Sequence, residues 1–509
     1  MRELTRPTGL LHLVLGICGA GACVPLALAN VRLPAVFSDH MVLLAQAPAP
    51  IWGWAEPGED VTVTIAGRVL RTKASSQGKW QVVFHQLATS ADPVTLSVVA
   101  ANTIMVHDVL IGEVWLGSGQ SNMAMIVAQA QDYAREQAAA NYPAIRVFTE
   151  RSGPSTTMQE AGSGTWVVCS PATVGGFSAT LFYFGREIHR ALRVPLGLIN
   201  SSVGGSPIEA WIAREAQEAS AELKPFMSLV ERERLAAEAA QVKFERALAV
   251  WQHETETPGA KKRPAQPRPP ALVRQARHAA PGCLFNAKIA PLIPYAIRGA
   301  LWYQGEANTA PEKAPYYRRQ LTLLVQDWRA RWGHEFPFAW AQLPNYAGPG
   351  RDWPTVREAM RQALALPQTG MGINIDIGNP NNVHPANKQE VGRRLSLWAL
   401  GSVYHREVVA TSGPLPLSHE IRGGEVIVTF AHADGGLVAR GGELTGFLIA
   451  GEDRQWRPAR ARTQGAIVML THPDVVHPVA MRYAWENDPV CNLYNGAGLP
   501  ASPFRTDTW

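Results

Sequence analysis

Several continuous apolar segments of the chain end in polar, glycine-bearing turns, and this repeated pattern restricts the fold more than any other feature. A segment that is apolar throughout, rather than at alternate positions, is typical of a strand buried on both faces. Segments of this kind end at Leu116, Ile199 and Tyr303, and a fourth expected strand, which includes Asn374 and Asp376, ends at Ile377. Stretches of helical composition lie between them, for example from Tyr316 to Trp332. The pattern predicts an α/β fold in which a parallel sheet is flanked by helices.

Alternating apolar and polar residues on either side of this central region predict two additional β domains. Val61 to Ile65 alternates in the N-terminal part of the chain, and Val426 to Phe430 alternates in the C-terminal part. Short alternating runs separated by turns are typical of antiparallel sheets. We therefore expect an N-terminal β-sandwich domain at 30–106, an α/β domain at 107–404 and a C-terminal β domain at 405–509.

The first 29 residues have the features of a secretory signal peptide. Arg2 and Arg6 precede the apolar run from Leu10 to Val24, and Ala27-Leu28-Ala29 provides a cleavage site of small residues. The apolar run is too short to anchor the protein in a bilayer. We expect a secreted or periplasmic protein with no membrane anchor.

The composition of the mature chain excludes several classes of function. The net charge of +5 is small for 509 residues, and basic residues cluster only at 261–263, so we expect no nucleic-acid partner. Cys169, Cys283 and Cys491 remain after the leader, and they can form one disulfide at most. No Cys-x-x-Cys or His-x-x-x-His spacing occurs, so we expect neither a metal nor another cofactor.

Ser121 is the strongest candidate for a reactive side chain. It lies just after Gly117 and Gly119, which permit a tight turn, and the residues after Met123 have helical composition. A serine at such a strand-to-helix corner has an exposed hydroxyl, and its own N–H points toward the group that the hydroxyl attacks. A serine that only caps the helix is the alternative for this segment taken alone.

Three later turns supply the other parts of a hydrolase site. Asn200 to Ser206 is a glycine-bearing donor turn, Gln304 to Asn308 carries side-chain amides, and His384 follows the fourth strand. The carboxyl ends of the strands in an open α/β sheet are where ligands bind. A serine, a donor turn, an amide-bearing turn and a late histidine, in this order, predict a hydrolase.

The order and the amino-acid sequences of these segments resemble those of the sialate O-acetylesterase family, a branch of the SGNH (GDSL-like) hydrolases. The resemblance is carried by Gly119-Gln120-Ser121-Asn122-Met123, Gly204-Gly205-Ser206, Trp302-Tyr303-Gln304-Gly305-Glu306 and the segment from Asp376 through His384-Pro385 to Lys388. It covers nearly the whole mature chain apart from one insertion. It implies an SGNH-type α/β domain and a secreted carbohydrate O-acetylesterase that hydrolyses O-acetyl esters of sialic acids through a serine acyl-enzyme.

The resemblance also implies roles for individual residues. Ser121 would be the nucleophile, and His384 would accept its proton. The backbone N–H groups of Ser121 and Gly205 would form the oxyanion hole. The side-chain amide of Gln304 or Asn308 would complete it.

Residues beside these turns are expected to contact the O-acetylated carbohydrate, namely Gln120, Trp211 and Glu306. For Glu306 we favour a role in bracing its turn over acid catalysis, because glycosidases need two carboxylates that flank the bond and no partner is evident. Lys388 lies one turn after His384 and is expected to cap the local network.

The sequence leaves the third catalytic member open. The acid of the wider SGNH group lies three residues before the histidine, where this chain has Asn381. A neutral amide does not stabilise imidazolium as a carboxylate does. Asp376 is one source of a carboxylate. The alternative, which we predict, is a Ser121–His384 pair in which a backbone carbonyl near Asn382 accepts the imidazole N–H and Asp376 is structural.

An insertion interrupts the central domain from residue 213 to about 282. Its first part is rich in Ala, Glu and Arg at helical spacing, which predicts one or two surface helices, and its second part is proline-rich. A solvated decoration is one interpretation. A lid over the site is the other, because the insertion begins soon after the Gly205 turn.

Two other functions are compatible with the sequence. The same scaffold could deacetylate a plant hemicellulose such as xylan or xyloglucan, because the motif residues contact the acetyl group and not the sugar. The β domains also permit a non-catalytic carbohydrate-binding protein, for which Ala124, in place of the family's acidic residue, is an argument. The intact Ser121 and His384 argue against that second alternative.

Overall fold

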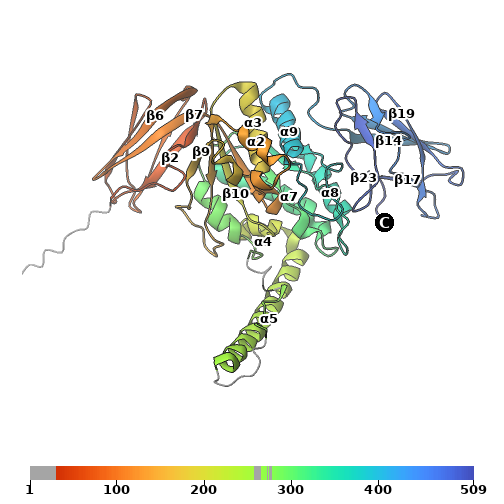
Figure 1. The fold of residues 1–509 in the computed structure, drawn as a ribbon, viewed down its shortest axis with the longest axis horizontal. Helices are drawn as coiled ribbons and strands as arrows, with labels where there is room; N and C mark the ends of the chain where they lie inside the picture. The colour runs from red at the N-terminus through yellow and green to blue at the C-terminus, as the bar shows by residue number, and fades with distance from the viewer. Residues whose placement is uncertain (1–29, 257–264, 272, 274–277) are drawn as a thin grey trace, which may run out of the picture.

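The structure is a computed structural model that describes residues 30–256, 265–271, 273 and 278–509. The expected signal peptide therefore lies outside the described residues. Figure 1 shows three regions in a row, with the first β-strands at one end, an α/β region in the centre and the last β-strands at the other end. This order follows the order of strand and helix patterns along the sequence.

The central sheet has the strand order β13-β12-β11-β7-β10-β8-β9. Its strands are β7 (Thr103–Gly119), β8 (Tyr142–Thr149), β9 (Trp166–Cys169), β10 (Leu196–Ser202), β11 (Gly299–Tyr303), β12 (Phe338–Ala341) and β13 (Thr369–Gly372). Neighbouring strands pair in parallel except β8 and β9, which are antiparallel. The predicted parallel sheet is present, with one antiparallel strand at its edge.

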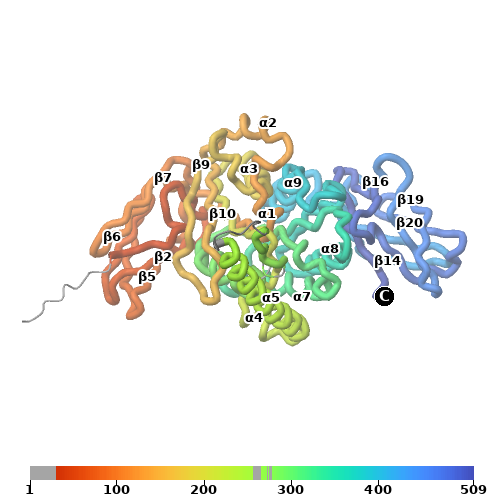
Figure 2. The backbone as a smooth tube through the Cα atoms, turned by 60° about the horizontal axis from the view of Figure 1, so that its bottom comes forward, coloured from red at the N-terminus to blue at the C-terminus, as the bar shows by residue number. Residues whose placement is uncertain are grey.

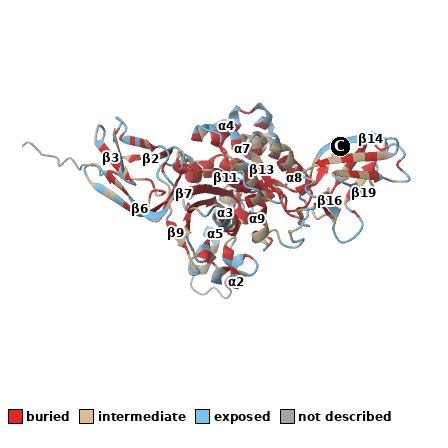
Figure 3. Ribbon diagram, turned by 90° about the horizontal axis from the view of Figure 1, so that it is seen from above, coloured by how far each residue is buried: buried red, intermediate tan, exposed pale blue. Residues whose placement is uncertain are grey.

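Helices cover both faces of this sheet. They are α3 (Ala179–Leu192), α7 (Tyr317–Trp332), α8 (Trp353–Gln362) and α9 (Lys388–Trp398). Leu301 and Tyr303 of β11 share a core with α3 and α9, whereas Trp302 between them shares a core with α7 and α8. Successive residues of a strand point to opposite faces, so the continuous apolar run is explained by burial on both sides. Figure 3 shows the strands of this sheet buried at the centre of the molecule.

Strand β7 connects the N-terminal region to the central sheet. Its first part pairs with β6 (Ser90–Val99), and its last part pairs with β10 and β11. The expected boundary between residues 106 and 107 therefore falls inside one continuous strand. The residues before Val109 alternate between exposed and buried positions, and only the residues after it are buried on both faces. The apolar run in the sequence marks only that second part.

The N-terminal strands form two sheets around a shared core. The strands are β1 (Val42–Leu44), β2 (Ala49–Trp54), β3 (Asp60–Ile65), β4 (Arg68–Lys73), β5 (Lys79–Phe84) and β6. β2 and β5 form one two-stranded sheet, while β4, β3, β6 and β7 pair in that order within the larger sheet. The buried residues of both sheets, such as Ile51 and Val63, belong to one hydrophobic core. This arrangement agrees with the alternation in the sequence.

The C-terminal region contains antiparallel sheets with their own hydrophobic core. One sheet consists of β14 (Leu415–Arg422), β15 (Glu425–Ala431), β20 (Ile467–Thr471) and β19 (Arg460–Gln464). Another consists of β18 (Arg457–Pro458), β17 (Phe447–Ala450), β21 (Ala480–Tyr483) and β23 (Phe504–Arg505). β16 (Leu437–Ala439) pairs with β22 (Leu493–Asn495). Arg357 of α8 donates to the carbonyls of Glu486 and Asn487, which ties this region to the central one.

The insertion forms the short helix α4 (Arg214–Ala219) and the long helix α5 (Lys224–Glu256). α5 extends from the central region into solvent, as Figure 1 shows, and in Figure 2 it lies in front of the central region beside α4. Residues 265–270 have no regular secondary structure, and the basic cluster at 261–263 lies outside the described residues. None of the described helices is both long enough and apolar enough to cross a membrane. Cys169, Cys283 and Cys491 are unpaired thiols.

Candidate active site

Ser121 lies at the corner between the central strand of the sheet and a short helix. β7 ends at Gly119, and α1 (Ser121–Ala124) begins two residues later. Gly119 has a φ of +135°, and a Cβ on it would lie 2.1 Å from the carbonyl oxygen of Tyr303. Only glycine fits this close approach between two strand ends. The predicted strand-to-helix corner is confirmed, and the glycine before Ser121 is explained.

His384 contacts Ser121 directly, although the two residues are far apart in the sequence. Its Nε2 atom lies 2.7 Å from the Oγ atom of Ser121. Burial lowers the pKa of His384 below its usual value, and the ammonium group of Lys388 lowers it further. The imidazole is therefore neutral at neutral pH, which is the state that accepts a proton from a hydroxyl.

Asn122 joins the segment that carries Ser121 to the loop that carries His384. Its Nδ2 atom donates to the carbonyl of Val383 at 2.9 Å and also to Oε1 of Glu306. Its Oδ1 atom accepts from Nζ of Lys388 at 2.5 Å. We assigned Asn122 no role from the sequence. The available signal was its position directly after the serine of the motif.

Lys388 and Glu306 are two buried ionisable groups that both hydrogen-bond to Asn122. Burial lowers the pKa of Lys388 to about 7, while the carboxylate of Glu306 opposes that shift. Burial also raises the pKa of Glu306, against the effects of its hydrogen bond from Asn122 and of the Lys388 charge. The Lys388 ammonium lies 5.1 Å from the centre of the Tyr303 ring. These contacts match the bracing roles expected for Lys388 and Glu306.

Asp376 is engaged by residues other than His384. Its carboxylate accepts from Arg394 at 2.6 and 2.9 Å and from the hydroxyl of Tyr494 at 3.2 Å. In the described part of the chain, the His384 ring hydrogen-bonds to Ser121 and to no carboxylate. The acceptor expected at a carbonyl near Asn382 is also not found there. Instead the Asn382 side chain accepts from the backbone N–H of His384 at 2.9 Å.

The turn after β10 lies directly beside the nucleophile. A Cβ on Gly204 would lie 3.6 Å from the Cβ of Ser121. The N–H of Gly205 has no backbone acceptor among the described residues. The N–H of Ser121, at the first position of its helix, has no acceptor within that helix. Neither N–H group is therefore engaged by the backbone hydrogen bonds of the described residues.

The side-chain amides expected in the oxyanion hole differ in their availability. Nε2 of Gln304 donates to Gln120, Ser206 and Asn308, so its two hydrogens are already engaged. Nδ2 of Asn308 donates to Glu209 at 2.8 Å and keeps a second hydrogen. Of the two candidates, Asn308 is therefore the one whose side-chain amide keeps an N–H that could bind an oxyanion.

Two residues expected to contact substrate are buried behind the site. Trp211 has no exposed surface, packs edge-on against Trp302 and donates from Nε1 to Ser206 at 2.9 Å. Gln120 is 4% exposed, and its Oε1 atom accepts from Gln304 and from the N–H of Ala307. The position of Trp211 after the turn suggested a pocket, but the chain directs its ring into the core. These side chains support the turns instead of lining the cleft.

A cavity of about 770 Å³ lies next to the Gly205 turn. Gly205 and Ala307 line it from the central domain, and Met227, Val230 and Ala237 of α5 line it from the insertion. The insertion therefore forms a wall of this cavity. The first half of α5 is therefore more than a solvated decoration.

An ion-pair chain connects α5 to the residues around Asn308. Nζ of Lys313 lies 2.7 Å from Glu233 on α5 and 3.8 Å from the buried carboxylate of Glu209. Burial raises the pKa of Glu209, although Lys313 and Asn308 oppose the shift. No group of three or more His, Cys, Asp or Glu side chains able to hold a metal occurs in the described ranges.

Comparisons with known proteins agree with this geometry. A family model described as "Carbohydrate esterase, sialic acid-specific acetylesterase" matches residues 111–266 and 271–397, more than half of the chain. Sialate O-acetylesterase from Mus musculus is 27% identical over 92% of this chain and 93% of its own length. The protein of the same name from Homo sapiens is 28% identical over 93% of this chain and 92% of its own length.

A solved structure shows the same fold over nearly the whole chain. It is a carbohydrate acetylesterase from Xanthomonas citri that is 33% identical, with a TM-score of 0.80, and the match covers 94% of this chain and 100% of that one. The family predicted from the sequence motifs is confirmed. This chain belongs to the sialic acid-specific acetylesterase family of carbohydrate esterases, and it is a carboxylic-ester hydrolase.

Proposed function

We propose that this esterase is secreted and removes O-acetyl groups from sialic acids through an acyl-enzyme on Ser121. The observation that carries the mechanism is the 2.7 Å contact between Oγ of Ser121 and Nε2 of His384. A serine hydroxyl hydrogen-bonded to a neutral imidazole is the arrangement of an activated nucleophile. The printed name of the mammalian relatives, sialate O-acetylesterase, supports the choice of substrate.

The reaction proceeds in two steps. Ser121 attacks the carbonyl carbon of the acetyl group while His384 takes its proton, and the tetrahedral oxyanion lies against the N–H groups of Ser121 and Gly205. One such donor lowers the barrier by about 3 kcal/mol. His384 then protonates the sugar oxygen as the C–O bond breaks. In the second step His384 activates a water that releases acetate from Ser121.

The pair of Ser121 and His384 works without Asp376 in this mechanism. The carboxylate of Asp376 is held by Arg394, so it is not free to orient the imidazole. Asn122 fixes the loop of His384 from the opposite side, through the carbonyl of Val383. The neighbours that pack around the His384 loop hold the imidazole in position, and this replaces part of the orientation that a third catalytic residue provides.

The cavity beside Gly205 suits a sugar that carries a carboxylate. Arg232 and Arg351 line it without an ion pair within the described residues, and four of the five glutamates that also line it are already paired with cations there, Glu312 being the exception. A guanidinium group binds a carboxylate through two parallel hydrogen bonds. Sialic acids carry such a carboxylate, whereas the neutral backbones of xylan and xyloglucan do not. This feature favours sialic acids over hemicellulose.

The test is acetate release by Ser121→Ala compared with Ser118→Ala. Ser118 is a matched control because it is buried near the end of β7, the strand that leads to Ser121, and its hydroxyl has no partner in the described part of the chain. We expect Ser121→Ala to lose turnover of p-nitrophenyl acetate while it keeps a wild-type melting curve, and Ser118→Ala to keep its activity. Retained activity in Ser121→Ala would overturn the mechanism.

The substrate and the location are tested separately. Wild-type enzyme is assayed side by side on O-acetylated sialic acids and on acetylated xylan and xyloglucan. Faster release from hemicellulose would overturn the sialic acid proposal and leave the mechanism standing. For secretion, the mature protein recovered outside the cytoplasm is expected to begin at Asn30. Recovery of the full-length chain in the cytoplasm would overturn it.

A further inference from the structure

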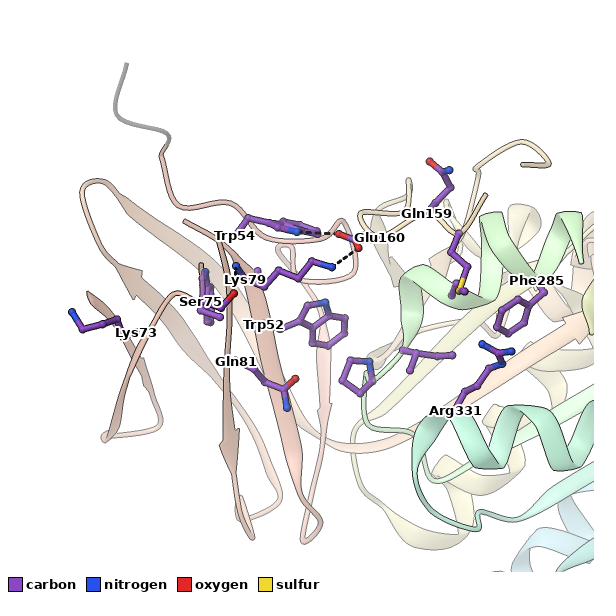
Figure 4. A pocket seen from close by; sticks show the side chains of 16 residues that line it. Trp52, Trp54, Lys73, Ser75, Lys79, Gln81, Gln159, Glu160, Phe285 and Arg331 are labelled. Atoms are coloured by element: carbon purple, nitrogen blue, oxygen red, sulfur yellow. Dashed lines mark hydrogen bonds and ion pairs between the residues drawn. The ribbon is translucent and has the colours of Figure 1, made fainter. Parts of the chain in front are cut away.

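A second cavity, of about 620 Å³, lies between the N-terminal strands and the central domain. Trp52, Trp54 and Gln81 line it from the paired strands β2 and β5. Phe285 and Arg331 line it from the central domain, and Figure 4 shows them across the space from Trp52. Its size falls in the range of small-molecule sites, and junctions between domains are places where such sites occur. The proposed mechanism makes no use of it.

The two tryptophans form one half-buried aromatic surface. Trp52 and Trp54 are separated by one residue on β2, so their side chains leave the same face of the sheet about 7 Å apart. The ring of Trp52 is held edge-on by Phe37, at 4.7 Å between ring centres. Nε1 of Trp54 donates to Glu160 at 3.2 Å. The rings are therefore fixed in place before any ligand arrives.

Polar groups surround this aromatic surface. Gln81 stands opposite Trp52 on β5, and Lys79 stands opposite Trp54. Glu160 bridges the two sides, because it accepts from both Lys79 and Trp54, as the dashed lines in Figure 4 show. Gln81 and Lys79 are exposed, so their donors and acceptors are accessible to a ligand.

The charges of the cavity are already neutralised by the protein. Lys73 pairs with Asp60 at 2.8 Å, and Lys79 pairs with Glu160 at 2.5 Å. Arg331 pairs with Asp327 at 2.8 Å and also with a second carboxylate on α4. The cations therefore have no unmatched charge to offer to an anionic ligand. In this respect the cavity differs from the one beside Gly205.

We propose that this cavity is a second carbohydrate site, which binds neutral sugar residues by stacking them on Trp52 and Trp54. The apolar face of a pyranose ring packs on an indole, and its hydroxyl groups bond to planar amide and carboxylate groups at the edge. Gln81 and Glu160 supply those groups. The site would hold the neutral part of a glycan whose acetylated sugar is processed elsewhere on the chain.

The test is titration of the intact mature protein with neutral oligosaccharides, followed by calorimetry and tryptophan fluorescence. The probes are N-acetyllactosamine, cellotetraose and xylotetraose, with N-acetylneuraminic acid as the charged comparison. The variants are Trp54→Ala and Gln81→Ala. Gln77→Ala is the matched control, because Gln77 is exposed in the turn before β5 and does not line the cavity.

We expect a neutral probe to bind, and both cavity variants to weaken its binding by about fivefold or more, as the loss of one hydrogen bond or stacking contact does. Gln77→Ala should bind as the wild type does, and hydrolysis of p-nitrophenyl acetate should not change in any variant. If Trp54→Ala does not fold, the exposed Gln81→Ala decides the result. The proposal is overturned if no neutral probe binds, if the cavity variants bind equally well, or if only the charged sugar binds there.

Discussion

Asp376 and Arg394 form a partly buried ion pair behind the active site. The two guanidinium–carboxylate hydrogen bonds measure 2.6 and 2.9 Å, and the side chains are 14% and 5% exposed. Arg394 lies on α9, whose first turn contains Lys388. The pair therefore anchors the helix that follows the His384 loop to the segment after β13. This geometry favours a structural role for Asp376 over a catalytic one.

Asp376→Asn should reduce stability much more than it reduces catalysis. The substitution removes one of the two carboxylates that pair with the Arg394 guanidinium and leaves Glu390, at 2.8 Å, as the other, so we expect a cost of about 2 kcal/mol of unfolding free energy. We expect a lower melting temperature and a kcat within about one order of magnitude of wild type. Denaturant unfolding and hydrolysis of p-nitrophenyl acetate measure the two effects.

Asp453→Asn is the control for that substitution, because its pair with Arg457 lies at the surface and should contribute nothing measurable. The opposite pattern for Asp376→Asn is also informative. Loss of a triad acid is expected to reduce kcat by about three orders of magnitude or more. If Asp376→Asn shows such a reduction with an unchanged melting curve, Asp376 is the third catalytic member.

Lys388→Gln should move the pH dependence of the reaction. His384 must be neutral to accept the serine proton, so kcat/KM rises with pH as the imidazole loses its proton. The positive charge of Lys388 disfavours imidazolium and lowers the pKa of His384, in addition to the effect of burial. Without that charge the acid limb of the profile should shift to higher pH, yet stay below the usual histidine pKa because burial remains.

The matched variant is Lys388→Met, which also removes the charge but cannot donate to Asn122. Both variants should shift the limb in the same direction, although the methionine variant should lose more kcat. If the acid limb of the kcat/KM profile stays in place, or moves to lower pH in both variants, the electrostatic role of Lys388 is contradicted. The readout is the midpoint of the profile, which a general loss of packing does not move.

The sequence predicted those parts of the site that depend on local chain geometry. The glycine before Ser121 and the polar turn before His384 mark strand ends, so the two residues could be assigned to one edge of the sheet. The bracing by Asn122 joins residues more than 250 positions apart, and no periodic pattern encodes such a contact. The buried position of Trp211 was missed for the same reason. Its neighbours in space, not in sequence, decide where the ring points.

Arg351→Ala should affect charged substrates selectively. Arg351 is exposed at the cavity beside Gly205, and its guanidinium has no ion-pair partner in the described ranges. We expect KM for an O-acetylated sialic acid to rise about tenfold, which corresponds to one charge-assisted hydrogen bond, while p-nitrophenyl acetate is hydrolysed normally.

Arg318→Ala is the matched control, because Arg318 is exposed on the neighbouring helix and does not line that cavity. It should leave both substrates unaffected. Equal KM values for wild type and Arg351→Ala on the sialic acid would remove Arg351 from the substrate site. An equal loss on both substrates would show a general effect on the cleft instead of recognition of a carboxylate.

Glu233→Gln tests whether the insertion shapes the substrate site. Glu233 on α5 binds Lys313, which also lies near the buried Glu209 that accepts from Asn308. Loss of the Glu233 charge loosens α5 against the cavity, so KM for the sialic acid substrate should rise severalfold, whereas the small acetyl ester should not be affected. Glu245→Gln is the control on the same helix, because Glu245 is exposed beyond the cavity. Unchanged kinetics for Glu233→Gln on both substrates would show that α5 covers this cavity without contributing to binding, and the insertion would then be a decoration after all.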